Sequence, residues 1–239
     1  SNSSADLMIG SGDLNISSEV SLTADEASTI TLNFTDDISI QLNNADLNIS
    51  AIANSSIDFS IDNLSGSANE VLLENTSSLI NMELTGDLLI NDKISITSFG
   101  QSADTQVILD GNVNFNYADL EVSLTDMSSD LNIYLKEISG DINSFTLSGA
   151  DNSQSANIEI DSGIITIHEK LNVESSTTSS DVTLTSFASL DLDNVYVAFD
   201  SANVSVLSSG PNSVADLSLS QVYGDVQNIE VSSEGLDSF

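Results

Sequence analysis

Hydrophobic and polar residues alternate one by one through most of the chain. In "ITLNF", Ile30, Leu32 and Phe34 fall on one side and the polar residues on the other. The same period of two appears in "ISIQL", "IDFSI", "VNFNY", "LEVSL", "LNIYL", "VTLTS" and "VYVAF". Because successive side chains of a strand point to opposite faces, each segment is predicted to be a strand with one buried face. No stretch has helical spacing and Ser, Thr and Asn are abundant, so the chain is predicted to be all-β.

Two short sequence units recur between and within these segments. The unit "DLNI" begins at Asp13, Asp46 and Asp130, and its unequal spacing gives no fixed repeat period. The unit Gly-Asp-aliphatic begins at Gly12, Gly86, Gly140 and Gly224. Glycine tolerates positive φ and Asp can bond to nearby backbone, so Gly-Asp is interpreted as a turn and not as a ligand loop.

The strand pattern fits two architectures. The preferred one is an elongated β-solenoid, or β-helix, of short stacked strands that forms a single domain over residues 1–239. Its indications are an aliphatic core with no Trp, a single proline and outward Ser, Thr and Asn that suit ladders between coils. The alternative is one or two β-sandwich domains, with boundaries at 1–100 and 107–239. Asp110-Gly111 favours this alternative, because Asp-Gly is typical of an antiparallel hairpin.

The charge narrows the range of partners. The net charge is −34, with three lysines, Lys93, Lys136 and Lys170, and no arginine. Binding to phosphates needs Lys and Arg, so nucleic acid and anionic membrane surfaces are not expected partners. Salt or divalent cations would screen the self-repulsion, which favours a saline or calcium-containing exterior. There is no cysteine, and no apolar run is long enough for a membrane-spanning helix.

Few groups in the chain could carry out catalysis. The single histidine, His168, is predicted to face outward as an ordinary surface residue, and no G-x-S-x-G motif accompanies it. Carboxylate pairs are plentiful, but the chain has no Trp to grip a sugar and no Arg to hold an anion. The protein is therefore predicted not to be an enzyme and to have no catalytic residues.

Acidic pairs are the candidate metal ligands, and Ca²⁺ is the cation that their hard oxygens suit. The candidate ligands are Asp36, Asp37, Asp58, Asp62, Glu159, Asp161, Asp191 and Asp193. Alternate acids such as Asp191 and Asp193 are also typical of the solvated face of a strand, which is the preferred interpretation of any single pair. Asn-x-Ser/Thr sequons occur mostly before residue 80, among them the one at Asn75, and would be glycosylation sites in an exported chain.

These observations predict an extracellular structural protein. The expected role is a self-assembling subunit of a surface fibre, sheath, surface layer or biofilm matrix, with copies of itself as partners and a signal peptide already removed. The terminal segment Ala5 to Ile9 is the candidate for a strand docked or exchanged between subunits. The alternative is a cell-surface adhesin or carbohydrate-binding module, and divalent cations and glycans are the other ligands considered.

Overall fold

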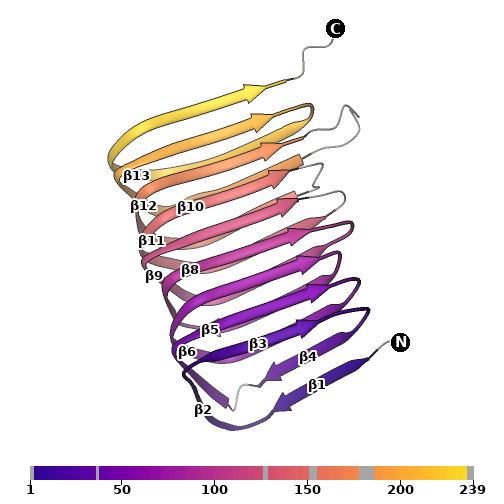
Figure 1. The fold of residues 1–239 in the computed structure, drawn as a ribbon. Helices are drawn as coiled ribbons and strands as arrows, with labels where there is room; N and C mark the ends of the chain where they lie inside the picture. Colours follow the sequence, from indigo (N-terminus) through magenta and orange to yellow (C-terminus); the bar gives the residue numbers. More distant parts are fainter. Residues whose placement is uncertain (1–2, 36–37, 126–128, 151–154, 178–185, 236–239) are drawn as a thin grey trace.

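The chain folds as a β-solenoid, which confirms the preferred architecture. The computed structural model describes residues 3–35, 38–125, 129–150, 155–177 and 186–235. Within this part of the chain there is no helix, and the strands form one sheet that winds through about nine stacked coils. Figure 1 shows the coils following one another along an axis, with the two ends of the chain at opposite ends of the stack.

The strands vary greatly in length because several of them run around corners of a coil. They are β1 (Ser4–Ile9), β2 (Gly12–Ile16), β3 (Glu19–Ala24), β4 (Thr29–Phe34), β5 (Ile38–Ile52), β6 (Ser56–Thr76), β7 (Leu79–Gly86), β8 (Leu88–Phe99), β9 (Asp104–Thr125), β10 (Asp130–Ala150), β11 (Ser155–Ser176), β12 (Ser186–Ser209) and β13 (Ser213–Glu234). All the pairings between them are parallel, so each strand lies in register on the coil before it.

Each coil has three faces, which the first coil shows as the separate strands β1, β2 and β3. Face A contains residues 4–9, 29–34, 56–61, 79–84, 104–109, 130–135, 155–160, 186–192 and 213–219. Face B follows it in each coil, from β2 to residues 221–225 of β13. Face C completes the coil, from β3 to residues 228–234. The sheet continues from β8 to β9, across the boundary that the sandwich alternative required.

The core consists of straight rows of aliphatic side chains that run along the axis. On face A one row is Leu7, Leu32, Phe59, Met82, Val107, Ile133, Ile158, Leu190 and Leu217. On face C the facing row is Leu22, Ile49, Leu73, Ile96, Val122, Leu147, Val173, Val206 and Val231. The residues of these two rows that lie in the middle coils are almost fully buried. The alternation in the sequence therefore sets which side chains enter the core, and the register sets which of them stack.

Buried polar residues line the corner where face C of one coil turns into face A of the next coil. Ser55 donates from Oγ to the carbonyl oxygen of Ala24, 3.0 Å away, and its backbone N–H donates to Ser78 Oγ at 3.2 Å. Fully buried Asn75 donates from Nδ2 to the carbonyl oxygens of Ser78 and Asp104, at 2.9 and 2.8 Å. These bonds satisfy backbone groups that the corner leaves outside the ladder. Asn75 begins a sequon, but its amide faces the interior of the folded chain.

Outward asparagines stack from coil to coil, as the sequence predicts. Asn91 donates from Nδ2 to Asn44 Oδ1, two coils before it, at 3.1 Å, and Asn116 donates to Asn91 Oδ1 on the neighbouring coil at 3.2 Å. The sequence separation in the second bond, 25 residues, is the usual length of a coil. It falls to 22 between Ser67 and Leu89 and rises to 33 between Asn172 and Ser205. This variation explains why no fixed period is found in the sequence.

The prediction of an antiparallel hairpin at Asp110-Gly111 is wrong. Both residues lie inside β9, which pairs in parallel with β7, β8 and β10. A Cβ added to Gly111 would lie 1.9 Å from the carbonyl oxygen of Gly86 on the neighbouring coil. Glycine is therefore required by the close approach of two backbones where a coil bends from face A to face B.

The turn interpretation of Gly-Asp agrees with the backbone. All four glycines of this unit have positive φ. Gly140 has a φ of +94°, and a Cβ there would lie 2.2 Å from the carbonyl oxygen of Phe115. Both the conformation and the space at this bend exclude a larger residue.

Gly140→Ala is expected to destabilise the protein by about 2–4 kcal/mol, because it adds positive-φ strain to a backbone clash. Urea unfolding followed by circular dichroism measures the loss. Gly10→Ala is the matched control, since a Cβ at Gly10 has nothing within 4 Å. Equal stability of the two variants would contradict this account of the bend.

Candidate functional site

Three of the eight predicted metal ligands lie on the outer surface of face A. Asp58 projects from β6, Glu159 from β11 and Asp191 from β12, and all three are exposed. Asp62 follows Asp58 where β6 leaves face A. Asp36 and Asp37 lie outside the described residues.

The stacking brings together two acids from different predicted pairs. Glu159 is the register partner of Asp191 on the next coil. Their sequence neighbours have other partners: the phenol of Tyr134 donates to Asp161, and Ser218 Oγ donates to Asp193. Among the described residues, no group of three or more His, Asp or Glu side chains is arranged to hold a metal ion. The calcium sites therefore stay a prediction.

A groove runs along face A between two columns of outward side chains, parallel to the axis. We call it the face-A groove. Its first column contains Asp58, Asn81, Gln106, Asn132, Asn157 and Ser189. Its second column contains Ser60, Glu83, Ile108, Tyr134, Glu159 and Asp191. The wider part, from residue 106 to residue 191, has a volume of about 360 Å³. A smaller hollow lined by Asp58, Asn81 and Glu83 continues it, with Gln106 and Ile108 common to both.

The carboxylates beside the groove affect neighbouring ionisable groups. The hydrogen bond to Asp161 raises the pKa of Tyr134 to about 12. Partial burial raises the pKa of Asp130 above its ordinary value of 3.8, and the charge of its register partner Asp104 adds to the effect. Lys136 Nζ lies 2.5 Å from Asp110 Oδ1, and this contact raises the pKa of the lysine. The groove region therefore has an excess of negative charge.

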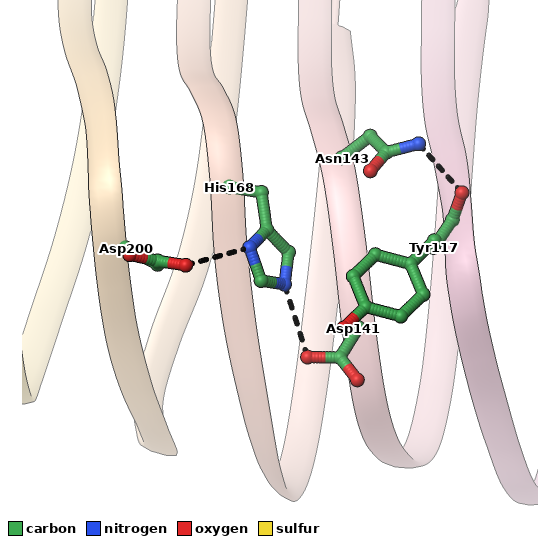
Figure 2. A network of polar contacts seen from close by, with 5 residues as sticks. All are labelled: Tyr117, Asp141, Asn143, His168 and Asp200. Atoms are coloured by element: carbon green, nitrogen blue, oxygen red, sulfur yellow. Dashed lines mark hydrogen bonds and ion pairs between the residues drawn. The ribbon is translucent and has the colours of Figure 1, made fainter.

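A second polar cluster lies at the corner between faces B and C. Figure 2 shows His168 between two carboxylates on the neighbouring coils. His168 Nε2 is 3.0 Å from Asp141 Oδ1, and Nδ1 is 3.2 Å from Asp200 Oδ2. The ring packs on Tyr117, with 5.0 Å between centroids, and Asn143 donates from Nδ2 to the Tyr117 carbonyl oxygen at 2.6 Å. His168 faces outward between buried Ile167 and exposed Glu169, as predicted, but its side chain is only 21% exposed because it contacts both carboxylates.

The corner cluster is suited to joining coils. Both ring nitrogens of His168 face carboxylates, so neither is free to accept a proton from a nucleophilic hydroxyl. Only the imidazolium can donate to both Asp141 and Asp200, because neutral histidine has a single N–H. The sequence does not reveal the cluster, since its two acids lie 27 and 32 residues from the histidine.

The outermost described coils present apolar side chains at both ends of the stack. At one end Leu7 and Met8 of β1 are exposed. At the other end Val222, Ile229 and Val231 of β13 are exposed. The predicted docked strand, Ala5 to Ile9, pairs in register with β4 of its own chain. In the described part of the chain, the outer edges of β1 and β13 have no further strand beside them.

Comparisons with known proteins identify no relative. No protein-family model matches the chain, and no match was found among curated proteins or solved structures. The described residues contain no helix with the length and apolar character needed to cross a membrane.

Asp130→Asn is expected to stabilise the protein at pH 7 and to have no such effect at pH 3. A raised pKa means that the folded state disfavours the ionised form, so this destabilisation appears as the pH rises through the folded-state pKa. Asp130 is only partly buried and its charge is screened, so the gain should be about 0.5 kcal/mol or less, roughly 1–2 °C in thermal midpoint.

Thermal unfolding at the two pH values checks this prediction. Asp13→Asn is the control, because it removes one charge from β2, where the register partner is Ser39 and not another acid. A gain for Asp130→Asn that is equal at both pH values would contradict the electrostatic explanation.

Proposed function

We propose that the protein is an extracellular structural subunit that assembles end to end into a fibre, sheath, surface layer or matrix. The observation that carries the proposal is the match between the two outermost coils. Leu217 of β13 and Leu7 of β1 belong to the same core row, and so do Val231 and Leu22. A second copy stacked on the first would continue both rows, with leucine on leucine and valine on leucine.

The backbone supports the same geometry. The outer edges of β1 and β13 carry N–H and C=O groups of the kind that pair with another strand. Every pairing within the chain is parallel, so a further coil added at either end would repeat the existing ladder. Stacking would also cover Ile229 and Val231, which are among the most exposed large hydrophobic residues of the described chain.

Electrostatic repulsion opposes the contact between the two ends, so the ionic strength would control assembly. Asp6 and Asp216 occupy the same outward column of face A, so stacking places the two carboxylates side by side. Two unit charges about 4 Å apart in water repel by about 1 kcal/mol, and salt reduces this repulsion. Assembly is therefore proposed to need raised ionic strength or divalent cations, as expected outside cells. A structural role of this kind needs no catalytic residue.

Ile229→Asp is expected to raise the critical concentration for assembly at least about tenfold, because burying an unpaired carboxylate costs more than about 1.4 kcal/mol. Ile164→Asp is the matched control. Both isoleucines are 68% exposed, but Ile164 lies on face B of β11, away from both ends. Sedimentation velocity and electron microscopy, at low salt, high salt and with Ca²⁺, measure the assembly.

The proposal predicts that the wild-type chain and Ile164→Asp polymerise at high salt, whereas Ile229→Asp stays monomeric at the same concentration. Equal assembly of the two variants would contradict end-to-end stacking. A wild-type chain that stays monomeric in every condition would contradict the structural role and favour the adhesin alternative.

A further inference from the structure

The face-A groove has a chemistry that neither the core nor end-to-end stacking requires. Its first column presents the amides of Gln106, Asn132 and Asn157, one from each of three successive coils. Its second column presents the ring of Tyr134 and the carboxylates of Glu159 and Asp191. A ligand lying in the groove would therefore cross the strands and contact the same kinds of group at each coil.

The amides and carboxylates together suit hydroxyl groups. Side-chain amides donate and accept hydrogen bonds, whereas ionised carboxylates only accept them. A hydroxyl group both donates and accepts, so it can bond to Asn132 and to Glu159 at once. A volume of about 360 Å³ lies within the range of small-molecule sites, and the open ends of the groove suit a chain.

Charge excludes anionic ligands. The groove holds Glu159 and Asp191, and the whole chain carries −34. Lys136, two residues after Tyr134, is paired with Asp110.

Tyr134 provides a fixed aromatic surface in the middle of the groove. Its hydroxyl donates to Asp161, which holds the ring in place and raises its pKa to about 12, so the phenol stays neutral. Ile108 lies beside it in the same column. An apolar ring face next to polar groups suits a ligand that has both C–H surfaces and hydroxyls.

We propose that the face-A groove binds a neutral oligosaccharide, which lies along the solenoid axis with one sugar over Tyr134 and hydroxyls bonded to the amide column. This goes beyond the structural role and does not depend on it, because the groove is formed within a single chain. Binding along the axis would allow one glycan to span several coils.

Binding to an array of neutral and acidic oligosaccharides, followed by calorimetry of the best neutral binder, tests the proposal on the full chain. Tyr134→Ala and Asn132→Ala are each expected to weaken binding about tenfold or more. Tyr134→Phe keeps the ring and should bind within about threefold of the wild type. Tyr196→Ala is the control, because Tyr196 is an exposed tyrosine on face B, outside the groove.

Circular dichroism and thermal unfolding establish that each variant is folded. If Tyr134→Ala does not fold, the binding of Asn132→Ala decides the test. Neutral-glycan binding that is lost in the groove variants and kept in Tyr196→Ala supports the proposal. No binding, binding of acidic glycans only, or binding unchanged by both groove variants would overturn it. Polymers without glycan binding would overturn this proposal alone, and glycan-binding monomers would overturn only the structural role.

Discussion

The structure depends on the in-register stacking of aliphatic side chains from one coil onto the next. Each coil buries the inward side chains of its rows only because a neighbouring coil lies above and below it. The core is therefore one continuous column along the axis. Parallel backbone hydrogen bonds hold the register, and asparagine ladders and buried serines reinforce the corners. These short-range contacts work against the repulsion of a chain with a net charge of −34.

The same constraint explains where functional surfaces occur. A side chain on a strand either enters the core or projects from a face, and the register places every outward residue in a column. Columns bring together groups that are far apart in sequence, such as Glu159 and Asp191. A register shift at the corner between faces B and C brings His168 between Asp141 and Asp200. The outermost coils, in turn, present the row residues themselves. Glycan binding on a face and assembly at the ends are therefore separate consequences of one architecture.

Local pattern was enough to predict the strands and their inward residues, because alternation depends only on neighbours in sequence. Composition, with no Trp and a single proline, favoured the solenoid over the sandwich. Local pattern could not give the register, since coil length varies from 22 to 33 residues. The three "DLNI" copies lie on three different faces: Asp13 on face B, Asp46 on face C and Asp130 on face A. Asp110-Gly111 was misread because glycine is required there by the close approach of the Gly86 backbone, and neither residue has the positive φ of an Asp-Gly hairpin turn. The groove and the His168 cluster depend on register, so the sequence alone did not reveal them.

Cryo-electron microscopy of the wild-type chain, at high concentration and high salt, tests the central claim most directly. Continuous stacking predicts filaments whose strands lie across the filament axis, with a repeat of about 4.7–4.9 Å that runs unbroken from one subunit into the next. Isolated rods one chain long, or filaments in which the repeat is interrupted between subunits, would contradict it.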